Sequence, residues 1–202
     1  MIPGAAAPAV AAGPSPGAHA APDDEAALVE RVRGGDAAAF DTLVTRYMGR
    51  AYAVAYRVMG QKEDAEDLVQ DGFLTVLQRI DTFQAGRPFA PWFFRILVNR
   101  GLNSRKARAL RTAGPIPESA SSGAPSPERE AERAELGERL RAALALLPER
   151  QRLVIELFEL EGFSGPEIAE ILGISDGTVR WHVHEARKAL RATLAPYDRS
   201  TG

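Results

Sequence analysis

Apolar residues recur at helical spacing along most of the chain, and this periodicity constrains the fold more than any other feature. The longest example runs from residue 40 to residue 58, with Phe40, Leu43, Val44, Tyr47, Ala51, Val54, Ala55 and Val58 at that spacing. No stretch shows the strict alternation of apolar and polar residues that is typical of a strand. The sequence therefore predicts an all-α protein.

Two low-complexity stretches divide this helical chain. Residues 1–22 are mostly Ala, Pro and Gly with almost no charge, which predicts a disordered tail. Residues 112–130 are rich in Pro, Ser and Gly, which predicts a flexible linker. We therefore expect two small helical domains, at 23–111 and 131–197, followed by a short tail at 198–202.

The composition excludes several classes of site. The chain has no Cys and three His, so disulfides and thiolate metal sites are excluded and a His-rich metal site is disfavoured. No Ser/His/Asp set, phosphate-binding loop or paired-carboxylate site is recognisable, so we expect neither an enzyme nor a cofactor. No apolar run is long enough to span a bilayer, and no basic segment precedes the apolar start. We therefore expect a cytoplasmic protein without membrane insertion.

The helix boundaries follow from breakers and capping residues. In the first domain, a four-helix bundle is expected: a short helix ending at Gly34, one capped by Asp36 and closed by Gly60, and helices at 63–80 and 92–109. Leu77 is expected on the buried side of the third helix. In the second domain, the spacing predicts four helices, at 136–147, 149–160, from Ser164 to 172 and at 176–194.

The last two of these helices read as a helix-turn-helix. Ala169 is small where two helices would cross, and Gly173 can take the left-handed conformation that the turn needs. Ile174 and Val179 would fill the angle between the helices. The outward positions of the second helix are Gly177, Thr178, Arg180, Trp181, His184, Glu185, Arg187 and Lys188. This face predicts DNA binding in the major groove, although an ordinary hairpin with a solvated basic face, and an inward-packed Trp181, remain open.

Residues 86–111 combine aromatic rings with positive charge and contain no Asp or Glu. Rings can stack on unpaired bases while cations follow the phosphate backbone, and a pocket in the loop at 81–91 could hold an extruded base. The candidates are Arg87, Phe89, Trp92, Arg95, Asn99, Arg100, Arg105 and Lys106. Several aromatics also fit core spacing, Trp92 included. A fold in which these cations are sealed inside and neutralised internally would contradict the nucleic-acid interpretation.

The helix expected at 63–80 has an acidic first half. Its candidate docking residues are Asp64, Glu66, Asp67, Leu68, Gln70, Asp71 and Phe73. A negative stripe could dock on a basic protein surface, where complementary charge sets register and encounter rate. The competing explanation is that acidic residues favour a helix N-terminus; it covers Glu63 to Glu66 better than Asp67 and Asp71.

These segments together resemble bacterial sigma factors of the extracytoplasmic-function group of the sigma-70 family. The segment "DAEDLVQDGF" carries the most specific likeness, "PWFFRILVNRGLNSRKAR" is similar to the promoter-melting region, and the helix-turn-helix is similar to the domain that reads the upstream promoter element. The resemblance covers about 25–111 and 136–194, as sigma regions 2 and 4. Trp181 departs from it, because a small or basic residue is frequent at that position.

The resemblance implies a division of roles. The acidic helix would dock on the clamp of the largest subunit of core RNA polymerase, and the second domain on the flap of the second-largest subunit. The aromatic and basic segment would capture and melt the downstream promoter element, and the helix-turn-helix would bind the double-stranded upstream element. An anti-sigma factor is an expected partner. The alternative is a stand-alone helix-turn-helix regulator, although such proteins usually carry an α/β receiver domain that the first block does not resemble.

Overall fold

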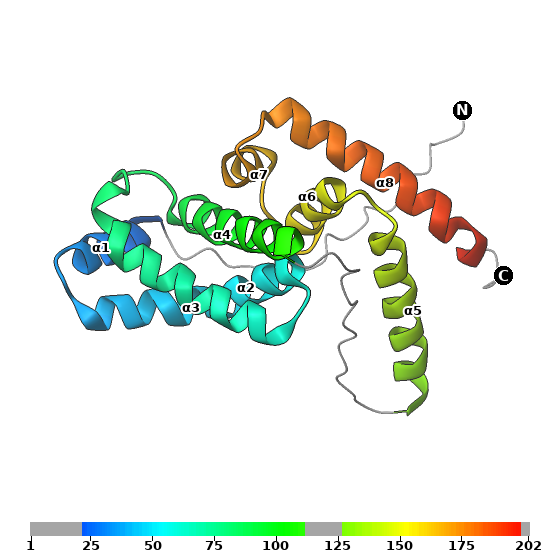
Figure 1. The fold of residues 1–202 in the computed structure, drawn as a ribbon, viewed down its shortest axis with the longest axis horizontal. Coiled ribbons are helices and arrows are strands. Elements are labelled where there is room, and N and C mark those ends of the chain that lie inside the picture. The colour runs from blue at the N-terminus through cyan, green and yellow to red at the C-terminus, as the bar shows by residue number, and fades with distance from the viewer. Residues whose placement is uncertain (1–21, 112–126, 199–202) are drawn as a thin grey trace, which may run out of the picture.

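The computed structural model describes residues 22–111 and 127–198, and within these two ranges the chain is helical with no strand (Figure 1). The first range holds α1 (Pro22–Arg33), α2 (Ala37–Met59), α3 (Lys62–Arg79), the 3-10 helix η1 (Ile80–Thr82) and α4 (Phe89–Arg111). The second holds α5 (Pro127–Ala145), α6 (Glu149–Glu159), α7 (Gly165–Leu172) and α8 (Asp176–Asp198). The all-α prediction of two four-helix domains is confirmed.

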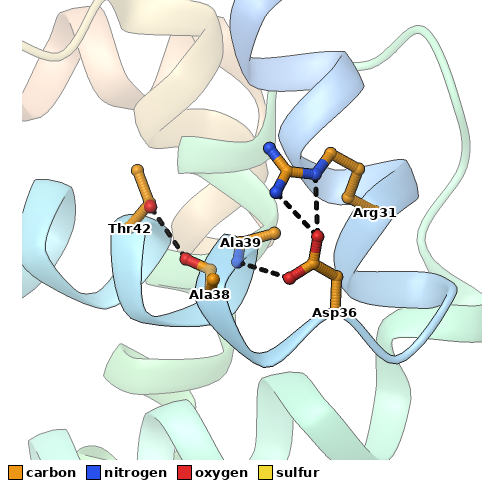
Figure 2. Close-up of polar contacts among 5 residues, drawn as sticks. All are labelled: Arg31, Asp36, Ala38, Ala39 and Thr42. Atoms are coloured by element: carbon orange, nitrogen blue, oxygen red, sulfur yellow. Dashed lines mark hydrogen bonds and ion pairs between the residues drawn. The ribbon is translucent and has the colours of Figure 1, made fainter.

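The cap of α2 shows how local chemistry sets a helix boundary. The Asp36 carboxylate accepts a hydrogen bond from the Ala39 backbone N–H at 3.1 Å and two from the Arg31 guanidinium at 2.9 and 2.7 Å (Figure 2). The hydrogen bonds from Arg31 and Ala39 lower the pKa of Asp36. At the other end of α2, Gly60 takes φ 76°, as its expected role in closing the helix requires.

The core of the first domain is built around aromatic rings. Tyr47 of α2 contacts Phe89, Phe93 and Phe94 of α4, with ring centroids 5.3 to 6.2 Å apart, and Phe73 of α3 stacks on Phe93 at 4.8 Å. Centroid separations of this size are those at which aromatic pairs attract beyond simple area burial. The apolar stripes of α2, α3 and α4 therefore share one core.

Two glycines let α4 approach its neighbours closely. A Cβ placed on Gly101 of α4 would lie 2.6 Å from Val58 Cγ1 and 2.8 Å from Leu68 Cδ2. A Cβ placed on Gly72 of α3 would lie 2.8 Å from Leu97 Cδ1. The helix crossings of the first domain are therefore set by positions at which a side chain is absent.

The second domain contains the expected helix-turn-helix. The Ser164 side chain accepts a hydrogen bond from the Glu167 N–H, and the Glu167 carboxylate accepts one from the Ser164 N–H, which completes the predicted capping box. Gly173 takes φ 64° in the turn before α8. Val179 is buried and Ile174 is partly buried against the core, as predicted for residues that fill the angle between the helices.

Three local predictions were wrong. Helix α5 begins at Pro127, well before residue 136, because Pro suits a first helical turn and the Glu, Arg and Ala that follow it favour a helix. Helix α4 begins at Phe89 instead of Trp92. Leu77 is 43% exposed, so it is not part of the core. The tail was predicted at 1–22; its residues 1–21, most of the linker and residues 199–202 lie outside the described residues, and Pro22 begins α1.

The two domains pack against each other: α7 contacts α4 and α6 contacts α2, with α8 on the outer side (Figure 1). Phe163, between α6 and α7, meets Phe94 of α4 with ring centroids 5.0 Å apart. The buried apolar residues of both domains consequently form one continuous cluster. No helix within the described ranges is long and apolar enough to cross a membrane.

Candidate functional site

The acidic candidates lie on the outward face of α3. Glu66, Asp67, Gln70 and Asp71 are exposed. Asp64 is partly buried, and its carboxylate accepts two hydrogen bonds, at 2.5 and 2.7 Å, from the Arg108 guanidinium. The negative charge on this face of α3 therefore extends beyond the first helical turn. The helix dipole favours acidic residues only within that first turn.

The two apolar candidates of the same helix have a different place. Leu68 is 6% exposed and Phe73 is 5% exposed, and both belong to the core of the first domain. Their side chains hold α3 against the core, and the exposed face of the helix consists of the polar candidates.

The cations of residues 86–111 have no acidic neighbour within their own segment, but several of them are paired with acidic residues from elsewhere in the chain. Acidic residues distant in the sequence pair with them: Asp71 with Arg100 at 2.5 Å, Asp64 with Arg108, Glu149 of α6 with Arg105, and Glu170 of α7 with Arg87 at 3.0 Å. For these four cations, the charge part of the condition that would contradict nucleic-acid binding is met.

The other part of that condition, that the cations are sealed inside the protein, is not met. The side chains of Arg87, Arg100 and Arg108 are 54, 45 and 53% exposed, and that of Arg105 is 24% exposed. Ion pairs between side chains this exposed are screened by solvent and add little to stability. A polyanion can therefore displace such carboxylates, and the basic face stays available for phosphate. Arg95, Asn99 and Lys106 are exposed as well.

Most aromatics of this segment are core residues. Phe89 is 1% exposed, and Phe93 and Phe94 are fully buried. Phe89, a candidate for capturing a base, is thus buried in this structure, between Tyr47, Phe83 and Trp92. Trp92 is half-buried, with one side packed on Phe83 at 5.2 Å.

Trp92 and Arg95 line a pocket of about 180 Å³ at the start of α4. The expected loop supplies most of its wall, with Thr82, Phe83, Gln84 and Arg87, and the second domain supplies Glu170. The prediction of a pocket at this loop matches the geometry, whereas the contribution of α7 was not foreseen. An aromatic ring beside two guanidinium groups suits an unpaired base with its phosphate.

The outward face of α8 has the composition expected of a recognition helix. Trp181 is 55% exposed, and the side chains of Arg180 and His184 are each 76% exposed. Gly177 and Lys188 are also exposed, whereas Thr178 and Glu185 are half-buried. Ser175 caps the helix by accepting a hydrogen bond from the Thr178 N–H at 3.1 Å.

The flank of α8 is tied to the neighbouring helix. Arg187 donates two hydrogen bonds, at 2.8 and 2.5 Å, to the Glu159 carboxylate at the end of α6, and its guanidinium lies 5.4 Å from the centre of the Phe158 ring. Arg187 is 46% exposed, so it is oriented rather than hidden. The candidate residues of α8 therefore share one surface.

Residues in the contact between the domains were missed by the sequence reasoning. Three acidic residues of the second domain pair with cations of the first: Glu149, Glu161 and Glu170. Arg50 of α2, one of these cations, lies at the contact between the two domains. Nothing in the local sequence marks them, because each partner is more than 40 positions away. The described residues hold no group of three or more His, Cys, Asp or Glu arranged to bind a metal ion.

Comparisons with known proteins identify both domains. The family pattern "Sigma-70 region 2" matches residues 43–111, and "Sigma-70, region 4" matches residues 137–190. The chain is 36% identical to the ECF RNA polymerase sigma factor SigE of Mycolicibacterium smegmatis, over 83% of this chain and 67% of that protein. It is 32% identical to the RNA polymerase sigma-H factor of Pseudomonas aeruginosa, over 84% of this chain and 93% of that protein.

Solved structures agree with these relatives. CnrH, in complex with the cytosolic domain of CnrY, has a TM-score of 0.62 and 32% identity, covering 85% of this chain and 97% of that one. The sigma factor RpoE of Bartonella quintana, in complex with the anti-sigma factor NepR, has a TM-score of 0.64 and 28% identity, covering 77% and 96%. A match to both sigma regions excludes the stand-alone regulator. The chain belongs to the extracytoplasmic-function RNA polymerase sigma factors, a family of transcription initiation factors.

Proposed function

We propose that this sigma factor divides its work among three surfaces. The outward acidic face of α3 docks on the clamp of core RNA polymerase, the basic face and pocket of α4 hold unpaired promoter DNA, and α8 reads the upstream element in the major groove. The protein supplies no reaction chemistry of its own and works beside polymerase in the cytoplasm. An anti-sigma factor is a further partner, supported by the complex of the related sigma factor RpoE with the anti-sigma factor NepR.

The exposed face of α8 is the observation that carries this proposal. Arg180, Trp181 and His184 project from the helix that follows the turn at Gly173, and their side chains are more than half exposed. A helix of this kind fits the major groove, where an Arg side chain can bind guanine through two hydrogen bonds. Trp181 gives this factor a base preference different from that of a relative with a small residue there.

Unpaired DNA adds the second part of the mechanism. Drawing bases out of a duplex costs a few kcal/mol, and each base stacked on an aromatic ring or a guanidinium plane returns about 1–3 kcal/mol. A few bases held beside Trp92 and Arg95 therefore suffice to favour the open duplex. Because each domain is small, tight promoter binding needs both domains at once.

The direct test mixes the protein with core polymerase and a promoter library. Run-off transcripts that require both components are the expected result. DNA binding without polymerase, together with an absence of transcripts, would contradict the proposal and favour a regulator that acts alone.

Charge reversal on α3 tests the docking surface. Asp67→Lys is expected to weaken core polymerase binding by about tenfold or more, because like charges at a complementary interface cost binding energy. Asp67 is preferable to Asp71, because Asp71 also pairs with Arg100. Asp41→Lys, on an exposed position of α2, is the matched control. Equal polymerase affinity for the two variants, measured by fluorescence anisotropy, would exclude this surface.

Substitution on α8 tests the reading surface. Arg180→Ala is expected to cost about 1–3 kcal/mol at one base pair of the upstream element and to relax specificity there. Binding of holoenzyme to a set of single-base promoter variants measures this loss. An equal loss on every sequence would identify Arg180 as a phosphate contact instead.

A further inference from the structure

A single helix, α1, holds both ends of the loop that walls the pocket beside Trp92. The loop leaves the 3-10 helix η1 at Phe83 and enters α4 at Phe89. Helix α1 contacts η1 and α4, and it lies at the end of the first domain where this loop joins α3 to α4 (Figure 1). The place of the pocket wall therefore depends on a segment far earlier in the chain.

Arg33, at the end of α1, holds the start of the loop. Its guanidinium donates hydrogen bonds to the main-chain oxygens of Phe83, at 2.6 Å, and Ile80, at 3.3 Å. These carbonyls close the helical stretch of α3 and η1, where the helix dipole favours a cation. The Arg33 Nε atom, shielded from solvent, finds no acceptor in residues 22–111 and 127–198. An unpaired buried N–H lowers stability, and a role in holding the loop explains why it is kept.

Glu25, two turns earlier in α1, holds the end of the loop. Its carboxylate accepts a hydrogen bond from the Phe89 backbone N–H at 3.3 Å and another from the Tyr47 hydroxyl. Phe89 is the first residue of α4, so this acceptor satisfies an N–H that the helix itself leaves unpaired, and its charge suits the helix N-terminus. The Tyr47 ring also packs on the Phe89 ring, at 5.3 Å between centroids.

The spacing along α1 places these two charges on the same side of the helix. Glu25, Val29 and Arg33 are separated by four positions each, and Val29 is buried in the core between the two charges. The apolar residues fix α1 on the domain, while an acidic and a basic side chain match the opposite polarities of two helix ends. One short helix thus sets the separation of α4 from η1.

The ends of the loop carry the aromatic rings that support Trp92. The Trp92 ring packs on Phe83 at 5.2 Å and on Phe89 at 5.7 Å, and these two rings contact each other at 5.8 Å. A ring that is already fixed in place captures a base at a lower cost in conformational entropy than a ring that must first be ordered. The orientation of Trp92 consequently depends on both ends of the loop.

We propose that α1 is a positioning helix for base capture, in which Arg33 and Glu25 fix the loop so that Trp92 faces the pocket before DNA arrives. The proposal rests on the function assigned to this pocket above. Both residues act through Phe83 and Phe89 rather than by touching the base.

Fluorescence quenching tests whether α1 holds Trp92. The chain has two Trp, so Trp181→Phe leaves Trp92 as the sole emitter. In this background, Arg33→Ala and Glu25→Ala are each expected to increase quenching by acrylamide and to shift the emission to longer wavelength. Arg33→Lys, which can still donate to a loop carbonyl, is expected to recover part of the effect. Arg79→Ala and Asp41→Ala remove equal charges from exposed positions of α3 and α2 and are expected to change neither property.

Promoter melting tests whether this position matters. Holoenzymes are compared on one promoter from the run-off library, and permanganate reactivity of unpaired thymines reports the open duplex. Arg33→Ala and Glu25→Ala are expected to lower the amount of open complex about three- to tenfold, the cost of ordering a loose side chain on binding. Affinity for core polymerase and for the double-stranded upstream element is expected to stay unchanged, whereas a merely unfolded variant would lose all three.

Three results would overturn the proposal. Unchanged quenching in both alanine variants would show that α1 does not hold Trp92. Increased quenching with normal melting would show that the position of Trp92 does not limit base capture. An equal loss of polymerase binding and melting would show a general structural defect. A Trp92→Ala protein that melts promoters as well as the wild type would instead contradict the function proposed for the pocket, and the quenching measurement is independent of that result.

Discussion

His182 is a partly buried histidine of α8. Its Nδ1 atom is inaccessible and has no hydrogen-bond partner within the described residues. Burial lowers the pKa of His182, and the nearby Arg150 lowers it further. The folded protein therefore keeps this side chain neutral at a pH at which an unfolded chain already binds a proton.

This shift makes stability depend on pH. As the pH falls below about 6.5, the ordinary histidine value, the unfolded state takes up the proton first and the free energy of unfolding decreases. The decrease ends below the lowered pKa of the folded state. Urea unfolding at pH 7.5 and 5.5 should show a smaller loss for His182→Gln than for the wild type. His184→Gln, on the exposed face of the same helix, is the control; an equal loss in all three proteins would contradict the assignment.

Single residues also show where sequence reasoning works. Asp36, Ser164 and Gly173 were predicted correctly because the atoms that satisfy them lie within five positions. The partners of Glu161 are more than 100 positions away, and no local pattern reports such a pairing. The acidic partners of the cations in residues 86–111 were not predicted, for the same reason.

At the scale of elements, the close crossing of α4 with α2 and α3 depends on Gly101 and Gly72. A Cβ on Gly101 would press on both Val58 and Leu68, and Val58 is β-branched and cannot easily turn aside. A Cβ on Gly72 would meet only the end of the Leu97 side chain closely. The two positions therefore differ in how well the structure can accommodate one added carbon.

Alanine substitutions measure this difference. Gly101→Ala should lower the free energy of unfolding by about 1–3 kcal/mol, the usual cost of overpacking, less up to about 1 kcal/mol regained from helix propensity. Gly72→Ala should be less destabilising because Leu97 can change rotamer. Chemical denaturation of the full-length protein compares the two. A Gly101→Ala variant as stable as the wild type would show that the crossing can widen freely.

The existence and order of helices were predictable from periodicity, but some of their ends were not. The early start of α5 follows from favourable helix formers that a Pro-rich neighbourhood concealed. Leu74 and Leu77 of α3 are both exposed, so the apolar residues of this helix extend beyond the face that meets the core. The inward and outward faces of α8, by contrast, follow from spacing, and Trp181 lies on the outward one.

At the scale of the whole molecule, the packed domains should unfold together. Trp92 lies in the first domain and Trp181 in the second, so Trp181→Phe and Trp92→Phe proteins report on one domain each. In the otherwise wild-type chain, the two fluorescence transitions in urea should coincide, because Phe163 and Glu161 couple the domains. Adding Glu161→Ala should separate them. Separate transitions in the wild-type background would show that the contact contributes little to stability.

The docking of the domains was beyond the reach of the sequence. Each domain has its own amphipathic pattern, which predicts its own core. The contact between them includes Phe163, which meets Phe94, and charged residues dispersed over several segments of both domains. Such scattered contact residues produce no periodic pattern in the sequence.

The ion pairs Asp71–Arg100 and Asp64–Arg108 join the acidic face of α3 to the basic face of α4. Any protein that binds these two carboxylates removes one counter-ion from each arginine and makes both arginines more attractive to a polyanion. Coupling between two binding sites is reciprocal. A polyanion bound to Arg100 and Arg108 therefore raises the affinity of that protein for the acidic face of α3 by the same factor. Because both ion pairs are exposed and screened by solvent, the cooperativity that they set is small.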